Sequence, residues 1–371
     1  MATRTKPLPT QTQPSATQAV SENLLKRIFD FAIEKNASDI HFKADIAPMI
    51  RVDSRLMTVA QVGKFSPQDS RRLIELTMTP EQTQLLAERR ELDFSFGYGE
   101  VRFRVNAYFE KGQLAAALRI IPKRIRTFRE LGLPPIIEKF TQSAQGLFVI
   151  TGPTGHGKST TLAAMVEHVN SARTDHIITI ENPIEYVFAN KRSIISQREV
   201  GTDTFSFARA LRSALRQDPN VILVGEMRDL ETIDTALTAA ETGHLIFTTL
   251  HTNSAAQTAD RIIDVFPPYQ QPQVRAQLAN VLLGIVSQRL IPKVGGGRVV
   301  ATEILVASSA VRNVIREGKT HQLDNIIATS AAEGMISLDK VLAELVTKGE
   351  ITIDEALTWA IDPKNLKTLI Y

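Results

Sequence analysis

The chain has 371 residues, 43% of them apolar and 22% charged, with a formal net charge of +3. This length predicts two or three domains, and the charge is too nearly balanced to indicate nucleic-acid binding. No stretch is long and apolar enough to predict a membrane span, and no signal peptide is evident, so we expect a cytoplasmic protein. The absence of cysteine excludes disulfides and thiolate metal sites.

The first third of the chain has a mixed pattern. Residues 1–20 have few large apolar side chains, which predicts a disordered tail. Residues 21–122 predict a small α+β domain, and the basic, Pro-rich residues 123–135 predict a linker. The expected helices are 22–36, 67–78 and 80–89, and the expected strands are 39–42, 49–52, 92–96, 101–106 and 114–121.

In residues 136–371, buried strands alternate with helices, which predicts an α/β domain with a mostly parallel sheet. Such a sheet binds its ligand at the carboxyl ends of its strands. The expected strands are 147–150, 176–180, 221–224 and 245–250, and the helices between them start near Ser159, Ser206 and Glu231. We expect a helix over 274–290, a hairpin at 295–297, and shorter C-terminal helices out to Trp359.

A glycine-rich turn joins the first of these strands to its helix and matches the pattern Gly, four residues, Gly-Lys-Ser. Backbone N–H groups of such a loop cradle polyphosphate, the lysine reaches the outer phosphates, and the serine hydroxyl holds Mg²⁺. An ordinary glycine turn is the alternative, but the strand and helix on either side favour a nucleotide site. The predicted nucleotide-binding residues are Gly152, Pro153, Thr154, Gly155, His156, Gly157, Lys158, Ser159 and Thr160.

Acidic residues follow the next two expected strands. One of Glu181 and Glu185 would activate the attacking water, although a surface position is the alternative and spacing does not choose between them. Glu226 follows four apolar residues, as in a Walker B element, and would be a catalytic or Mg²⁺-binding acid. Gly225 stands where such elements often have aspartate, which weakens the metal assignment.

Two histidines bracket the strand 245–250. His251 follows the strand at its carboxyl end, where a sensor of the γ-phosphate would lie, whereas His244 precedes the strand at the opposite end. A hydrogen-bonded core histidine is the alternative for each. Position therefore favours His251 as the catalytic residue.

Arginines gather on two further segments. In the helix 206–216, Arg209, Arg212 and Arg216 share one face, which is either solvated or contacts phosphates across a subunit boundary. Arg102 and Arg104 share one strand face in the first domain, and Arg119 lies on the next strand. Arg102, Arg104 and Arg119 are the other arginines that could contact the phosphates of a nucleotide bound by a neighbouring subunit.

Together these motifs resemble the type IV pilus retraction ATPases of the secretion ATPase superfamily. The resemblance covers residue 24 to the C-terminus and rests on several separate segments. They are residues 37–41, 152–160, 181–185, 196–200, 210–216, 224–229, 241–244 with 249–252, and 310–317.

The resemblance implies a PAS-like first domain and a RecA-like second domain, assembled into a homohexameric ring with ATP and Mg²⁺ between subunits. It implies that Glu185 is the catalytic base, Glu226 the Walker B glutamate, and His244 and His251 a His box. It implies that four arginines lie near the nucleotide, namely Arg104, Arg119, Arg212 and Arg216. Residues 310–317 match a helical motif that the family needs for retraction.

The implied partners are an inner-membrane pilus platform protein and a second pilus motor ATPase, with peripheral attachment at the inner face of the cytoplasmic membrane. Two residues depart from the family: His156 replaces a usual serine, and Asn182 replaces a usual aspartate. We hypothesise that Asn182 slows or re-tunes hydrolysis, because it removes a charge beside the expected base.

Other functions stay open. A pilus-extension or secretion motor is the nearest alternative. The extension ATPases of the superfamily that this chain resembles usually carry a tetracysteine zinc site, so the absence of cysteine favours retraction. A RecA-like nucleic-acid translocase would need a basic groove with aromatic stacking platforms, which one Trp and five Tyr do not suggest. A nucleotide-gated scaffold without useful turnover is the third alternative.

Overall fold

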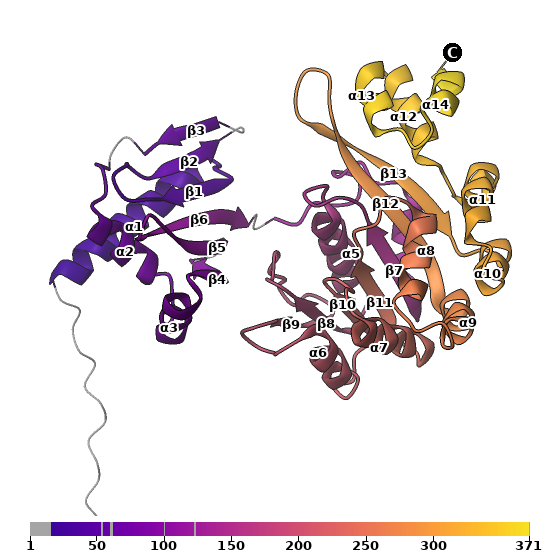
Figure 1. Cartoon of the computed structure of the whole chain (residues 1–371), viewed down its shortest axis with the longest axis horizontal. Helices are drawn as coiled ribbons and strands as arrows, with labels where there is room; N and C mark the ends of the chain where they lie inside the picture. The colour runs from indigo at the N-terminus through magenta and orange to yellow at the C-terminus, as the bar shows by residue number, and fades with distance from the viewer. Residues whose placement is uncertain (1–15, 53–54, 60–61, 100, 122–123, 371) are drawn as a thin grey trace, which may run out of the picture. The chain divides into compact units, whose positions relative to one another are not determined.

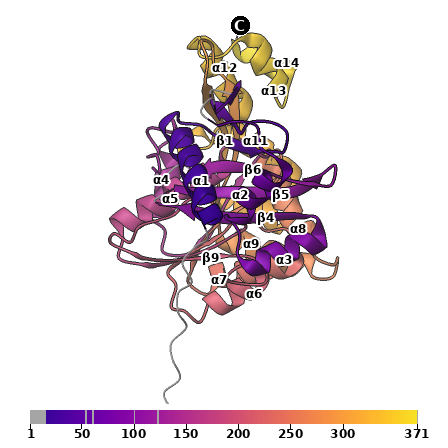
Figure 2. The ribbon, with the colours of Figure 1, turned by 90° about the vertical axis from the view of Figure 1, so that its left-hand side faces the viewer.

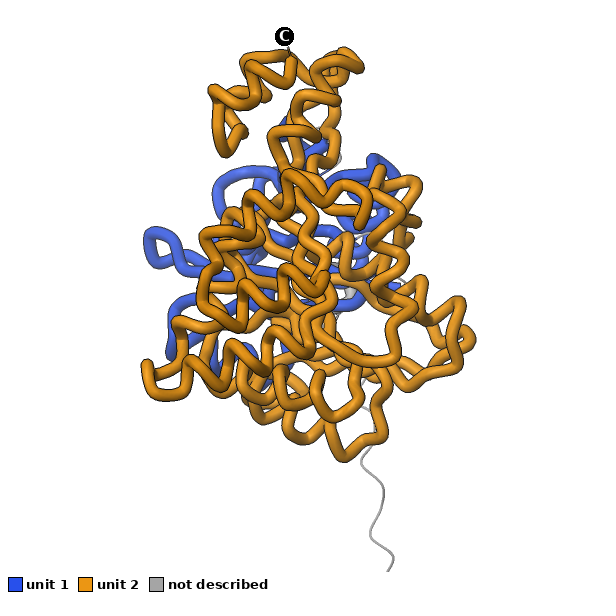
Figure 3. Tube along the Cα trace, turned by 90° about the vertical axis from the view of Figure 1, so that its right-hand side faces the viewer, with its two compact units in different colours: residues 1–123 blue, residues 124–371 orange. Residues whose placement is uncertain are grey.

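The computed structural model describes residues 16–52, 55–59, 62–99, 101–121 and 124–370. Two compact units, residues 1–123 and 124–371, divide the chain (Figure 3). Of the expected disordered tail, residues 1–15 lie outside the described residues. Helix α1 begins at Ala16, earlier than the expected start at residue 22. None of the described helices is long and apolar enough to cross a membrane.

The first unit is an antiparallel sheet with three helices (Figure 1). The helices are α1 (Ala16–Glu34), α2 (Pro67–Glu75) and α3 (Pro80–Arg89). The strands, ordered β3-β2-β1-β6-β5-β4, are β1 (Asp39–Phe42), β2 (Met49–Val52), β3 (Arg55–Thr58), β4 (Glu91–Tyr98), β5 (Val101–Glu110) and β6 (Gln113–Ile121). The α+β domain is thereby confirmed, with β3 as a strand that the sequence did not predict.

Aromatic packing explains why α1 lies against this sheet (Figure 2). Phe29 of α1 is fully buried and stacks on Phe103 of β5, with ring centroids 4.6 Å apart. Ser66 and Thr79 each form a capping box that begins α2 and α3, respectively.

The second unit contains a seven-stranded sheet of order β13-β12-β7-β11-β10-β8-β9. Its strands are β7 (Gly146–Thr151), β8 (His176–Glu181), β9 (Ile194–Glu199), β10 (Val221–Val224), β11 (Leu245–Thr249), β12 (Leu282–Pro292) and β13 (Arg298–Val306). All neighbours are parallel except β12 and β13, which form the expected hairpin around residues 295–297. The four predicted strands of this domain are confirmed, and β9 was not predicted.

Helices cover both faces of this sheet because its strands are apolar on both sides. Side chains of α4 and α5 pack on the face that carries Phe148, and those of α6 to α11 pack on the face that carries Val149. The helices are α4 (Ile136–Thr141), α5 (Lys158–Ala172), α6 (Phe207–Ala214), α7 (Leu230–Glu241), α8 (Ala255–Asp264), α9 (Gln271–Val281), α10 (Ser309–Arg316) and α11 (Leu323–Thr329), with short 3₁₀ turns at Thr320–Gln322 and Ala331–Glu333.

The expected helix over residues 274–290 is wrong beyond α9, because β12 begins at Leu282. The segment is apolar throughout, so its periodicity does not separate a buried helix from a buried strand. In the fold it lies between β7 and β13 and pairs with both. Gly284 permits this position, since a Cβ there would lie 2.6 Å from the Phe140 ring.

The last three helices are α12 (Leu338–Thr347), α13 (Ile353–Trp359) and α14 (Pro363–Ile370). They share a small separate core with Ile291 and Ala301 of the hairpin β12–β13. In Figure 1 these yellow helices gather beside that hairpin. The C-terminal helical region is therefore attached to the sheet through its antiparallel edge.

Candidate functional site

Four neighbouring parallel strands of the second unit end at the same edge of the sheet. Ile150 of β7 is level with Thr249 of β11, and Val224 of β10 is level with both Thr248 and Ile180. The segments that follow these strands carry the predicted glycine-rich loop and the predicted acids and histidine. The topology therefore brings these segments to one edge, as the strand order of a parallel sheet requires.

The glycine-rich loop needs glycine where it passes β12. Gly152 has φ +130°, and a Cβ there would lie only 2.3 Å from the carbonyl oxygen of Gln288. Gly157 has φ +82° and meets the Gln288 side chain in the same way. This left-handed backbone directs the chain into α5, whose N-terminus carries the partial positive charge that favours phosphate.

Lys158 is the first residue of α5 and is only 7% exposed. Its ammonium donates hydrogen bonds to the carbonyl oxygens of Gly152 at 2.7 Å and Pro153 at 3.0 Å. Burial lowers the pKa of Lys158, while the nearby Glu185 and Glu226 oppose that effect. Both acids are thus close enough to act electrostatically on the lysine that would bind phosphate.

His251 connects Lys158 with Glu226. Its Nδ1 lies 3.5 Å from Lys158 Nζ, and its Nε2 lies 3.5 Å from Glu226 Oε2. Burial and the Lys158 charge lower the pKa of His251, although Glu226 partly offsets them. The imidazole is therefore neutral at pH 7 and has one donor and one acceptor nitrogen. Arg228 also holds Glu226, with Nε 2.6 Å from the same carboxylate oxygen.

Glu181 and Glu185 occupy different environments after β8. Glu181 accepts hydrogen bonds from Thr179 Oγ1 at 2.7 Å, from Gln197 Nε2 at 3.4 Å and from the backbone N–H of Glu185 at 3.5 Å. Burial raises the pKa of Glu181 to about 7. Glu181 therefore holds the loop that carries Glu185, and Glu185 remains the acid whose charge acts on Lys158.

The donor set also fits a magnesium ion bound together with phosphates. Mg²⁺ is usually held by one or two carboxylates, a hydroxyl and substrate phosphates, with water completing its shell. Ser159 follows Lys158, and Glu226 is tied to Lys158 through His251. No cluster of three or more acidic, histidine or cysteine ligands exists among the described residues, so a dedicated all-protein metal cage is not indicated there.

His244 lies away from this edge. It precedes β11, whose first residue pairs with Gly146 at the start of β7, and its Nδ1 is 2.9 Å from the carbonyl oxygen of Ala239. Within one chain His244 is thus at the opposite end of β11 from His251. Its expected role stays a prediction that requires a second subunit.

The predicted arginines lie on two different units. Arg104 of β5 pairs in register with Arg119 of β6, and Arg119 Nε lies 3.0 Å from Asp39 Oδ1. Arg212 of α6 forms an ion pair of 2.6 Å with Glu231. Arg216 lies just after α6, which ends at Ala214 and not at the expected residue 216, and it lines a cavity of about 410 Å³. Their expected approach to nucleotide stays a prediction.

Sequence reasoning missed three residues that shape the site. Gln288 donates to the His156 carbonyl at 2.8 Å and accepts from Thr161 Oγ1 at 2.8 Å, but it lies on the strand that was expected to be a helix. Tyr186 OH lies 2.9 Å from Thr160 Oγ1, and Gln197 donates to the Tyr186 carbonyl at 2.8 Å. The position of Tyr186 directly after Glu185 was the available signal.

A family model described as "Type II/IV secretion system protein" matches residues 15–296. The chain belongs to this family. It is 47% identical over 316 residues to "Type IV pilus retractation ATPase PilT" of Pseudomonas aeruginosa, covering 85% of this chain and 92% of that protein. It is 48% identical to "Twitching motility protein" of Neisseria gonorrhoeae, covering 79% of each chain.

Solved structures agree with this membership. The structure titled "Crystal Structure of the Pilus Retraction Motor PilT and Bound ADP" matches with a TM-score of 0.87 and 48% identity, covering 93% of this chain and 99% of that one. The expected fold class is thereby confirmed: an N-terminal α+β domain precedes a RecA-like P-loop domain with C-terminal helices. The more detailed likeness of the first unit to PAS domains stays a prediction.

Proposed function

We propose that this protein is an ATP-hydrolysing motor that drives retraction of a type IV pilus. This proposal rests on two contacts, one between Lys158 and His251 and one between His251 and Glu226. Both lie at the edge of the sheet where the phosphate loop begins. Membership of the secretion family and the similarity to a pilus retraction ATPase support the same conclusion.

In this proposal each residue has a distinct task. Lys158 and the backbone N–H groups of residues 152–160 bind the phosphates of ATP, and Glu185 accepts a proton from the attacking water. His251 senses the γ-phosphate, because its neutral ring can donate to a phosphate oxygen or accept from Lys158. Ser159 and Glu226 hold Mg²⁺, which supplies charge neutralisation at the phosphates.

The motor would work as a homohexameric ring. Residues 21–122 would form its N-terminal domain, 123–135 the linker and 136–371 the ATPase domain. Arg104, Arg119, Arg212 and Arg216 would stabilise charge on the nucleotide at subunit boundaries, and His244 would complete the His box there. Arg212 would first have to leave its ion pair with Glu231, which is half-exposed and therefore inexpensive to break.

The partners of the ring would be an inner-membrane pilus platform protein and a second pilus motor ATPase. The protein would be cytoplasmic and would reach the inner face of the membrane through those partners, without binding nucleic acid. Balanced charge and the low tryptophan and tyrosine content support the last point.

The test is the piliation of a strain that carries Lys158→Ala in place of the native gene. Loss of retraction leaves cells with abundant pili and no twitching motility, which is the expected result. Cells without pili would instead identify an extension motor, and normal piliation with a secretion defect would identify a secretion motor.

A biochemical assay separates the remaining alternatives. Purified protein should hydrolyse ATP over many turnovers, and Glu185→Gln should abolish turnover while nucleotide still binds. Strong stimulation by single-stranded DNA would favour a translocase. A single burst of phosphate followed by no turnover would favour a nucleotide-gated scaffold.

A further inference from the structure

The side chain of His156 connects the phosphate loop to two other elements. The backbone N–H of Leu290 on β12 donates to His156 Nδ1 at 3.0 Å. The ring of Trp359, the last residue of α13, approaches the imidazole nearly edge-on, with ring centroids 5.2 Å apart and an angle of 64°. One residue of the loop is thus held by the sheet and by the C-terminal helices.

The hydrogen bond defines the chemical state of the ring. Nδ1 can accept the Leu290 N–H only when it carries no proton, so the imidazole is neutral with its proton on Nε2. The charged groups that act on it are Lys158 of α5, Arg289 of β12 and Arg298 near the hairpin turn, and all are cations. Together with burial they lower the pKa of His156. Protonation would remove the acceptor and break the contact with Leu290.

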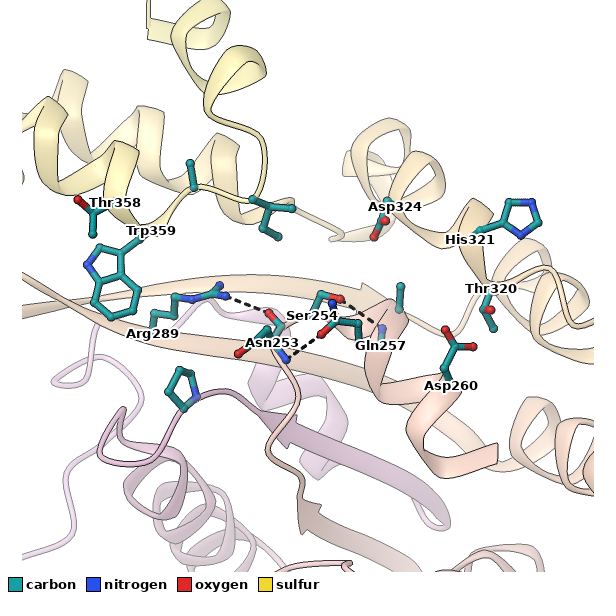
Figure 4. A pocket seen from close by; sticks show the side chains of 14 residues that line it. Asn253, Ser254, Gln257, Asp260, Arg289, Thr320, His321, Asp324, Thr358 and Trp359 are labelled. Carbon is teal, nitrogen blue, oxygen red and sulfur yellow. Dashed lines mark hydrogen bonds between the residues drawn. The ribbon is translucent and has the colours of Figure 1, made fainter. Parts of the chain in front are cut away.

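Trp359 is positioned to pass on a displacement of the loop. It packs on the core shared by α12, α13 and α14, which is separate from the cores on the two faces of the sheet. A cavity of about 580 Å³ borders the same place and is lined by Pro153, Arg289 and Trp359 among others (Figure 4). Trp359 lines this cavity, so there is open space beside its side chain.

We propose that His156 is a positioning residue that ties the phosphate loop to the C-terminal helices, so that nucleotide binding changes the packing of Trp359. The inference rests on the proposed nucleotide site. Phosphate adds negative charge beside Lys158, whose ammonium is bonded to two carbonyl oxygens of the loop. When Lys158 turns to phosphate, the loop is released from those bonds, and His156 transmits the change to α13.

The chain offers a direct probe because Trp359 is its single tryptophan. Emission of the full-length protein is measured during titration with ADP and Mg²⁺, and binding is followed in parallel by calorimetry. We expect the emission maximum to shift on binding. We also expect emission to fall as the pH is lowered, with a midpoint below the ordinary value for histidine, because a protonated His156 loses its hydrogen bond with Leu290 and quenches the indole.

Variants separate the two contacts. His156→Ser removes both and should raise the KM for ATP about tenfold, with a smaller change in kcat, and should abolish both emission responses. His156→Asn keeps an acceptor for Leu290 and should recover part of the KM. Trp359→Ala removes only the ring contact, so it should raise the KM by less than His156→Ser, while Trp359→Phe, which keeps a ring, should remain close to wild type. His168→Ser, on α5 and not among the residues that line this cavity, is the matched control and should keep both responses.

Wild-type protein alone can overturn the proposal. ADP that binds by calorimetry without any change in emission contradicts the coupling and leaves the proposed nucleotide site intact. Failure of ADP to bind contradicts both. A KM in folded His156→Ser equal to that of wild type shows that His156 does not position the loop.

Discussion

His251 Nε2 lies 3.5 Å from Glu226 Oε2, which joins the segment after β11 to the segment after β10 at the phosphate edge. Neither residue is near the other in sequence, and each follows a strand that is otherwise wholly buried. The contact places a neutral imidazole between an acid and the ammonium of Lys158. Replacing each of these residues separately tests its role in the site.

Replacing His251 by alanine should lower kcat for ATP hydrolysis about a hundredfold, because a positioned donor near the transferred phosphate is lost. The effect on KM should be smaller, since Lys158 and the loop still bind the phosphates. Steady-state phosphate release measures both constants. His321→Ala, an exposed substitution of the same kind, should keep wild-type turnover, and an unchanged kcat in His251→Ala would contradict the role of His251.

Gly152→Ala should destabilise the phosphate loop by several kcal/mol and remove ATP binding. The added Cβ would lie 2.3 Å from the Gln288 carbonyl oxygen at a φ of +130°, so backbone must move. Gly155→Ala is the matched comparison, because its φ is also positive but nothing lies within 4 Å of the added Cβ. It should cost only about 1 kcal/mol. Equal nucleotide affinities in the two variants would show that contact with β12 does not shape the loop.

Glu181→Gln should change how stability depends on pH. Burial raises the pKa of Glu181 from 4.5 to about 7, so the folded state holds the proton more tightly than the unfolded chain. The resulting stabilisation is complete below pH 4.5 and is lost as pH rises through 7. Glutamine cannot ionise. Between pH 5 and pH 8 the free energy of unfolding of the variant should therefore fall by about 2 kcal/mol less than that of wild type.

Urea unfolding at these two pH values measures the difference in the free energy of unfolding. The exposed Glu344→Gln serves as the control and should keep the wild-type pH dependence. A wild-type pH dependence in Glu181→Gln would mean that Glu181 is ionised in the folded protein.

Arg312→Ala should destabilise the second unit by about 2–4 kcal/mol. The guanidinium donates to the carbonyl oxygens of Ala307, Asn280 and Leu282 at 2.7–3.0 Å, and also to Ala279, so it closes the C-terminal end of α9. Its neighbour Arg316 is exposed and makes one long contact with Asn280, at 3.4 Å, so Arg316→Ala should change stability by less than about 0.5 kcal/mol.

Thermal unfolding measures both arginine variants. The comparison also separates two roles within the helical motif at residues 310–317. Loss of twitching in Arg312→Ala would follow from unfolding, whereas loss in the stable Arg316→Ala would indicate a surface needed for the motor. Equal stability of both variants would contradict the structural role of Arg312.

The sequence alone determined the elements whose signals are local. The phosphate loop follows from glycine spacing between an apolar strand and a helix, and the buried strands β7, β8, β10 and β11 follow from short apolar runs. The sequence also distinguished His251 from His244, because His251 follows the strand at its carboxyl end and His244 precedes it. Spacing did not choose between Glu181 and Glu185, because both follow the same strand.

Tertiary structure decided what depends on partners distant in sequence. The apolar segment after residue 281 is compatible with helix or strand, and pairing with β7 and β13 makes it β12. That strand brings Gln288 and Leu290 against the phosphate loop, and the chain returns with α13 to place Trp359 on His156. Burial, which arises only in the folded chain, raises the pKa of Glu181 and leaves Glu185 as the acid whose charge acts on Lys158. Local chemistry thus identifies the phosphate loop, while long-range pairing and desolvation determine which side chains surround it.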